Sequence, residues 1–176
     1  MSPPYLVTAI SAILLSTSLL AEEPKELQDA RLKYEQASPY PTEAAEAARS
    51  HYVTRLVRMR ETFARLETDD WQAIDAEIKR HPAPPDSDAK ALSRLLVGKW
   101  QSPRHDYLYR ADGTWAMLPA EEGSPNGHWR IGGNQYFNKP ATDQALEEQF
   151  TIILLTATDF VFADKENVFY EKRIRK

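Results

Sequence analysis

Residues 98–114 read Gly-Lys-Trp-Gln-Ser-Pro-Arg-His-Asp-Tyr-Leu-Tyr-Arg-Ala-Asp-Gly-Thr, and the pattern of this stretch predicts the start of a β structure. Gly98–Ser102 predicts a first strand, which Pro103 stops because proline has no backbone N–H to donate. His105–Arg110 predicts a second strand with Tyr107 and Tyr109 on one face. Between this strand and the next, Asp112-Gly113 predicts a tight turn, since glycine tolerates positive φ. The stretch therefore predicts an antiparallel hairpin.

The same pattern of short runs and turns continues to the C-terminal end. Further strands are predicted at Thr114–Leu118, Gly127–Ile131, Gln135–Asn138, Gln149–Thr156, Phe160–Ala163 and Val168–Ile174. Short strands joined by local turns indicate an antiparallel meander, and closure into a barrel would remove its unpaired edges. We therefore expect an α+β fold whose β part is a small antiparallel meander β-barrel or a strongly curved sheet.

The chain before Gly98 has a different composition. All 6 Gly and 12 of the 18 aromatic residues lie at or after Gly98, while residues 22–97 are rich in Ala, Glu and Arg, which favour helices. A first helix is predicted over Lys25–Gln36, and Pro39 and Pro41 then break the chain. Two further helices carry apolar seams: Tyr52, Leu56, Met59, Phe63 and Leu66 on one, and Trp71, Ile74 and Ile78 on the other. We expect these two helices to form an antiparallel hairpin with facing seams.

Charged residues on the helices have ordinary explanations. The arginines at 49, 55, 58, 60 and 65 alternate with glutamates, which predicts a solvated helix face rather than an anion-binding stripe. Asp69 and Asp70 precede the last helix of the hairpin, where capping and the helix dipole favour acidic residues. The seam of the longer helix is too short for a self-associating coiled coil, so packing on the neighbouring helix is expected.

Two adjacent prolines mark the boundary between the helical and β parts. Residues 83–88 read Ala-Pro-Pro-Asp-Ser-Asp, and such a stiff segment is expected to space the hairpin from the β part. Ser87 or Asp88 can cap a short helix in which three leucines (Leu92, Leu95 and Leu96) align as a lid or plug for the β unit. The expected organisation is a helical hairpin region at 22–82, a linker at 83–88 and a β domain at 89–176.

The first 21 residues carry no charged side chain and predict an export signal. An apolar run ends at Ala21 and is followed by Glu22-Glu23-Pro24, which is typical of a secretory signal peptide over residues 1–21. The apolar run is short and lacks basic flanks, which favours cleavage over a permanent membrane anchor. We therefore expect a periplasmic or secreted protein with no stable membrane anchor after cleavage.

Two Gly-x-Trp sequences, Gly98-Lys99-Trp100 and Gly127-His128-Trp129, follow the predicted short helix in the sequence. The first opens the predicted β-hairpin and the second comes after it. This arrangement resembles a small lipocalin-like (calycin-type) domain over about half of the chain. The resemblance implies that Gly98 and Trp100 form the base of a barrel, with Arg173 or Lys172 of the last strand packed across the tryptophan. The helical half, including Asp70–Arg80, resembles a module that precedes such domains in secreted bacterial proteins of unknown function, and it implies no activity.

The sequence contains none of the common catalytic motifs. With no Cys, disulfides, a thiol nucleophile and Cys-based metal sites are excluded. A net charge of -4 with mixed signs gives no support for nucleic-acid binding. There is no Gly-x-Ser-x-Gly, P-loop, Gly-x-Gly-x-x-Gly or His-Glu-x-x-His sequence. No catalytic residue and no cofactor is indicated, and an enzyme is not expected.

A metal site receives little support. His105-Asp106 and His128 could meet in the β part, but they would need further ligands such as Asp112 or Glu121. Histidines exposed at strand ends are the simpler interpretation, so no metal is expected.

Aromatic residues at alternate positions of successive strands are the most informative feature for function. We identify Tyr107, Tyr109, Trp115, Trp129 and Tyr136 as candidate ligand-binding residues, with Phe150 in the same set. In a small domain such residues can simply fill the core, or they can line a shallow apolar pocket. The first functional hypothesis is an exported, non-enzymatic binding or accessory protein for a small apolar or glycan ligand. The alternative is a structural or assembly protein of the cell envelope, whose hairpin contacts an envelope protein partner.

Overall fold

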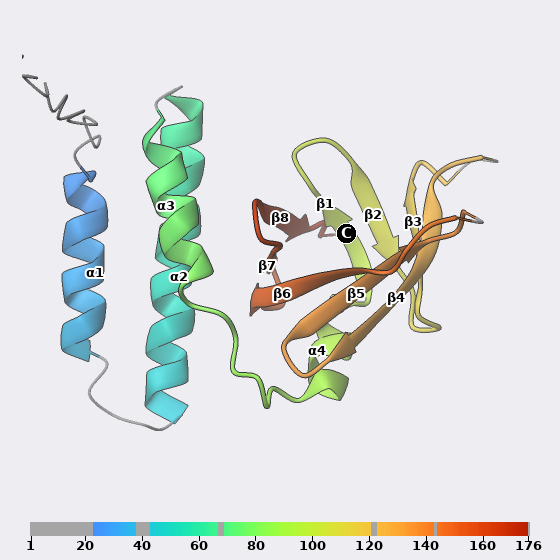
Figure 1. The fold of residues 1–176 in the computed structure, drawn as a ribbon, viewed down its shortest axis with the longest axis horizontal. Coiled ribbons are helices and arrows are strands. Elements are labelled where there is room, and N and C mark those ends of the chain that lie inside the picture. Colours follow the sequence, from blue (N-terminus) through green and yellow to red (C-terminus); the bar gives the residue numbers. More distant parts are fainter. Residues whose placement is uncertain (1–22, 38–42, 67–68, 121–122, 143, 176) are drawn as a thin grey trace, which may run out of the picture.

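A computed structural model describes residues 23–37, 43–66, 69–120, 123–142 and 144–175. Within these ranges, three helices stand beside a β-barrel, and a short fourth helix lies at one end of the barrel (Figure 1). The expected signal peptide, residues 1–21, lies outside the described residues, as does Glu121. In the part of the chain that the structure describes, no helix is long and apolar enough to cross a bilayer.

The strands form one closed antiparallel barrel in which each strand pairs with the next along the chain and β8 pairs with β1. Their bounds are Gly98–Gln101 (β1), Asp106–Tyr109 (β2), Thr114–Leu118 (β3), Asn126–Gly132 (β4), Gln135–Pro140 (β5), Glu148–Leu155 (β6), Asp159–Ala163 (β7) and Val168–Arg173 (β8). Each predicted strand is present, with ends that differ by at most two residues. The α+β, lipocalin-like class is therefore confirmed, and the sheet is closed into a barrel rather than merely curved.

The short helix before the barrel is present as α4 (Ala89–Leu96). The side chain of Asp88 accepts hydrogen bonds from the backbone N–H groups of Lys90 and Ala91, which confirms a capped start. Leu96 is fully buried in the barrel core, and Leu92 and Leu95 pack against that core. The helix therefore covers one end of the barrel with its leucine face.

Helices α1 (Lys25–Ala37), α2 (Glu43–Arg65) and α3 (Asp70–Lys79) share a second core with the outer face of the barrel. The strand residues in this core are Ile153, Leu154, Val161, Ala163 and Val168. From the helices, Tyr52 and Leu56 of the predicted seam are buried there, together with Ile74 and Ile78. The sequence pattern predicts that Leu66 continues the seam, but α2 ends at Arg65 and Leu66 is 63% exposed, so the seam ends at Phe63.

Two helix arginines do not belong to a solvated face, which corrects the expectation from the charge pattern. Arg49 donates hydrogen bonds of 2.8 Å to the backbone oxygens of His81 and Ile153, and thereby joins α2 to the segment after α3 and to β6. Arg60 lies over the ring of Tyr170 at 4.6 Å and donates to Asp75 of α3. Both guanidinium groups contact carbonyls, carboxylates or rings of other elements. Helical periodicity alone does not predict such contacts.

Asp69 and Asp70, expected to cap α3 and to interact with its dipole, do so only in part. Asp69 occupies the N-cap position, but its side chain makes no capping hydrogen bond because its backbone is already in the helical region. Asp70 lies in the first turn, where the dipole of α3 favours a negative charge.

The proline-rich segment attaches to the barrel instead of spacing the two parts. The backbone N–H of Ala83 donates to the carbonyl of Ile152 at 2.9 Å. The side chain of the buried Asn134, between β4 and β5, donates to the carbonyl of Ala83 at 2.7 Å. Because its backbone groups are paired with the barrel, the segment holds the helices against it.

Candidate functional site

The barrel interior brings together the five candidate ligand-binding residues. Ring centroids of Tyr107 and Trp115 are 6.0 Å apart, those of Tyr109 and Trp129 are 6.0 Å apart, and those of Tyr109 and Tyr136 are 6.3 Å apart. Tyr107 is half-buried and the other four are buried. The edge-to-face contacts between the rings are a favourable arrangement for aromatic side chains.

Phenylalanines extend this aromatic lining around the barrel. Phe162 stacks on Phe160 at 4.5 Å and on Phe169 at 5.1 Å, and Phe150 stacks on Tyr136 at 5.8 Å. The side chains at the α4 end, such as Trp100 and Phe160, are fully buried. Tyr107, Phe150 and Phe169 keep partial exposure. The fully buried rings thus lie toward α4, and the partly exposed rings lie toward the opposite end of the barrel, which we call the open end.

A carboxyl group lies inside this aromatic lining. Glu171 of β8 is 5% exposed, and its Oε1 accepts a hydrogen bond of 3.1 Å from the hydroxyl of Tyr109. Its Oε2 is buried and has no hydrogen-bond partner among the described residues. Burial raises the pKa of Glu171 to about 8, although the bond from Tyr109 opposes this rise. At neutral pH the group is therefore largely protonated, which is unusual for a glutamate.

The tyrosines near Glu171 have raised pKa values. Burial raises the pKa of Tyr107, and the charge of Glu171 raises it further. Tyr109 and Tyr136 also have raised pKa values, in both cases through burial first and with a contribution from the Glu171 charge. These residues come from β2, β5 and β8, so one buried acid is surrounded by three phenols that stay neutral. We call Glu171 and these three tyrosines the interior acid cluster.

Three more buried polar atoms of the barrel lack hydrogen-bond partners among the described residues. They are Nε1 of Trp115, Oδ1 of Asn138 and Nε of Arg173. Asn138 lies opposite Trp129 in the β4–β5 register, and Trp115 lies opposite Tyr109 in the β2–β3 register, so both face the interior with their partners. An unpaired buried polar group costs free energy, and such groups are often found where a ligand supplies the missing bond.

Gly98, Trp100 and Arg173 meet at the α4 end of the barrel. The guanidinium of Arg173 lies over the Trp100 ring at 4.4 Å and donates to the carbonyls of Val97 and Leu95. The indole N–H of Trp100 donates to the carbonyl of Leu96 at 2.7 Å. Gly98 has a φ of +143°, and a Cβ at this position would collide with the guanidinium. Lys172, the other basic residue considered, points outward and pairs with Glu61.

We expect Trp100→Ala to lower the free energy of unfolding by about 3–5 kcal/mol, because it empties a fully buried site and removes a buried hydrogen bond. Arg173→Lys should cost about 1–2 kcal/mol, since lysine lacks the planar group that stacks and bonds two carbonyls. Urea denaturation measures both changes. Lys172→Ala is the matched control, and as an exposed ion pair it should change stability by less than about 1 kcal/mol. Equal losses for Lys172→Ala and Arg173→Lys would contradict this role of the Arg173 contacts.

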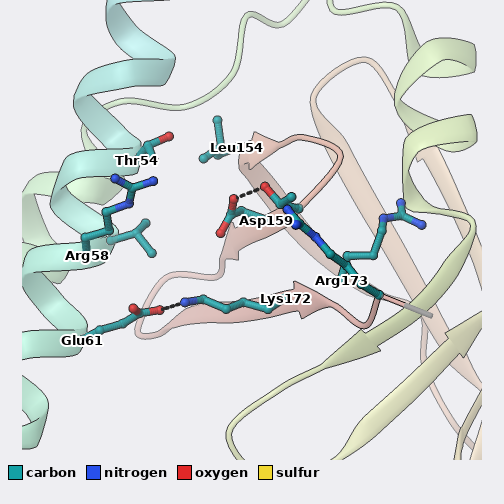
Figure 2. Close-up of a pocket in the computed structure, with 10 residues that line it drawn as sticks. Thr54, Arg58, Glu61, Leu154, Asp159, Lys172 and Arg173 are labelled. Carbon is teal, nitrogen blue, oxygen red and sulfur yellow. Dashed lines mark hydrogen bonds and ion pairs between the residues drawn. The ribbon is translucent and has the colours of Figure 1, made fainter.

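A surface pocket of about 320 Å³ between α2 and the barrel is a second place where a ligand could bind (Figure 2). It is lined by Thr54, Val57, Arg58, Glu61, Leu154, Thr158, Asp159, Lys172, Arg173 and Arg175. Lys172 lies 2.6 Å from Glu61, and Asp159 accepts a hydrogen bond from Thr158, so both acids already have partners. Figure 2 shows the side chain of Arg173 leading away from this pocket, toward α4. The mixed charges and existing pairs make this pocket a weaker candidate than the barrel interior.

Within the described ranges, no group of three His, Asp or Glu side chains is close enough to hold a metal ion. His105 and His128 are exposed, whereas His81 contacts Tyr34 and Tyr52 edge-on at 5.1 Å and bonds to Glu77. His81 therefore belongs to the packing of the helices.

Sequence reasoning missed Glu171. Its position offered one usable signal, because alternation along β8 places residue 171 on the same face as Phe169 and Arg173. A glutamate at an inward position of a strand is exceptional enough to mark a functional candidate.

No protein-family model matches the chain, and no similar protein was found among curated proteins or solved structures. The class is therefore defined by architecture: an α+β protein in which a closed eight-stranded antiparallel barrel of lipocalin-like topology carries helices on its outer face.

Proposed function

We propose that this chain is an exported, non-enzymatic binding protein whose β-barrel holds a small, largely apolar ligand at the open end. The observation that carries the proposal is the unpartnered carboxyl oxygen of Glu171 inside an aromatic lining. Aromatic rings provide apolar contact area, and a few buried polar groups provide orientation, which is the composition of small-molecule sites. The half-buried rings of Tyr107, Phe150 and Phe169 are the side chains that would move to admit the ligand.

The contacts of the helices favour the barrel over the hairpin as the binding part. Leu56, Ile74 and Ile78 are fully buried against one another and against the barrel. Their seams are already occupied within the chain, so a partner protein in the envelope would have to use other surfaces. The proposed export to the periplasm or medium rests on residues 1–21 of the sequence alone.

Tryptophan fluorescence of the purified protein tests the proposal, because Trp115 and Trp129 lie within the aromatic lining. We expect a saturable change with at least one member of a panel of neutral aromatic alcohols, fatty acids and oligosaccharides. Tyr107→Ala should weaken that ligand at least about tenfold by removing ring contact at the open end. Leu146→Ala is the control, since Leu146 is 84% exposed and lies outside the barrel core. No change with any compound, or an equal loss in both variants, would refute the proposal.

A further inference from the structure

The charge balance of the barrel interior is the starting point for a more specific inference, which rests on the proposed function. Among the described residues, Glu171 forms no ion pair with a Lys, Arg or His side chain. Its nearest basic neighbour on the same strand face is Arg173. The two terminal nitrogens of this guanidinium donate to the carbonyls of Val97 and Leu95, and the group lies over Trp100. Its Nε is buried and has no hydrogen-bond partner among the described residues. Within the described residues, the carboxyl of Glu171 is therefore not neutralised by an ion pair.

The other titratable groups near Glu171 are also acids. Tyr107 and Tyr109 face it from β2 and Tyr136 from β5, and the charge of Glu171 acts on all three. Glu148, on β6 at the open end, adds a second negative charge that acts on Tyr136. A negative charge in a low-dielectric interior attracts a cation strongly and repels an anion.

The rings around the acid are suited to the same kind of ligand. Tyr107, Tyr109, Trp115 and Trp129 are linked by contacts of 6.0 to 6.3 Å between ring centroids. Aromatic faces carry partial negative charge, and clusters of Tyr and Trp bind quaternary and protonated amines. Apolar contact area, negative ring faces and an unpaired carboxyl therefore occur together in one place.

We propose that the barrel interior selects a small organic cation, whose charged nitrogen becomes the partner of Glu171 while its apolar part contacts the surrounding rings. Binding would ionise Glu171 and release its proton to the solvent, so the ligand and the proton compete. Since burial raises the pKa of Glu171 to about 8, the affinity for a permanent cation should increase with pH over the neutral range. A neutral ligand of the same shape should show no such increase.

Phenyltrimethylammonium and its uncharged counterpart, tert-butylbenzene, distinguish the two cases by tryptophan fluorescence titration. The cation should bind about 50-fold more tightly at pH 8 than at pH 6, because the ionised fraction of Glu171 grows by about that factor for the pKa of about 8. The affinity for tert-butylbenzene should be the same at both pH values. This comparison uses the unmodified protein and so does not depend on any variant folding correctly.

Glu171→Gln provides the second measurement, with circular dichroism as the check of its fold. The variant should lose the pH dependence and bind the cation at least about 30-fold more weakly at pH 8, while its affinity for tert-butylbenzene is kept. Glu147→Gln is the matched control, because Glu147 pairs with Arg130 on the surface and its side chain is 40% exposed, and it should change the cation affinity by less than about threefold. Equal losses in both variants would overturn the specific role of Glu171.

The outcomes separate this inference from the proposed function. If tert-butylbenzene binds as tightly as the cation at both pH values, the cation class is wrong and the binding function stands. If neither probe binds but the panel of alcohols, fatty acids and oligosaccharides yields a ligand, the cation class is again wrong and the binding function again stands. If the probes and the panel are all silent, both proposals are refuted.

Discussion

Glu77→Gln is expected to lower the free energy of unfolding by about 3 kcal/mol at pH 7 and by much less at pH 3. Glu77 of α3 is 3% exposed and is the centre of a network that joins the three helices. Its carboxylate accepts hydrogen bonds from Arg31 of α1 at 2.8 Å, Tyr52 of α2 at 3.0 Å and His81 at 3.1 Å. Glutamine keeps the shape of the side chain but removes the charge on which the bond from Arg31 depends.

The pH dependence of this loss is set by the pKa of Glu77. Burial raises the pKa, but the hydrogen bonds from Arg31, His81 and Tyr52 outweigh burial and lower it to about 2, from 4.5 in the unfolded chain. A lowered pKa contributes stability that is complete above about pH 5 and is lost as the pH falls toward 2. A difference of about 2.5 pKa units corresponds to about 3 kcal/mol.

Urea denaturation at pH 3, 5 and 7 measures this effect. Glu147→Gln is the matched control, because Glu147 pairs with Arg130 on the surface and its side chain is 40% exposed. The control should change the free energy of unfolding by less than about 1 kcal/mol at any pH. A loss for Glu77→Gln that is the same at pH 3 and pH 7 would mean that shape, and not charge, explains the effect.

Glu171→Gln is expected to have the opposite effect and to stabilise the protein. The substitution should raise the free energy of unfolding by about 3 kcal/mol more at pH 8 than at pH 5. Burial raises the pKa of Glu171 from 4.5 to about 8. A carboxyl with a raised pKa favours folding at low pH, and this contribution is lost as the pH rises from about 4.5 to 8. Glutamine stays neutral at every pH, so the variant avoids the cost of a buried negative charge while keeping an acceptor for Tyr109.

Thermal or urea unfolding of both chains between pH 5 and 8 tests this prediction. The stability of the unmodified protein should fall over this range relative to the variant, and the two curves should converge toward pH 5. A variant that is less stable at pH 8 than the unmodified chain would show that the carboxylate is paired in the folded state. Glu77 changes the free energy of unfolding below about pH 5, and Glu171 changes it above about pH 5. One series of unfolding measurements over pH therefore separates the two contributions.

The opposite behaviour expected of these two glutamates fits the proposed binding function. Glu77 is paired with Arg31 of a neighbouring helix and stabilises the fold, whereas Glu171 accepts one hydrogen bond from a phenol and has an unpaired oxygen. Functional sites often retain a group that costs stability because the ligand satisfies it. A cationic ligand at Glu171 would therefore stabilise the protein most at pH 8, where the unpaired charge costs most.

Local patterns in the sequence were enough to determine the elements and the class. Alternating aromatic residues, the Asp112-Gly113 turn and the capped leucine helix each act over a few residues, and together they specify strands, turns and α4. The same local patterns indicated the aromatic lining, because alternation decides which side chains of a strand share a face.

Which charged groups are paired depends on contacts between elements that are distant in the sequence. Arg49 and Arg60 match a solvated pattern on their own helix, yet carbonyls and rings from other elements surround them. Strand alternation places Glu171 on an inward face, but no local pattern shows that its carboxyl lacks an ion-pair partner while the carboxylate of Glu77 has one. The cost of a buried charge depends on partners far away in the chain, so the sequence determined the barrel and its aromatic lining, while tertiary packing decided where the unpaired acid lies.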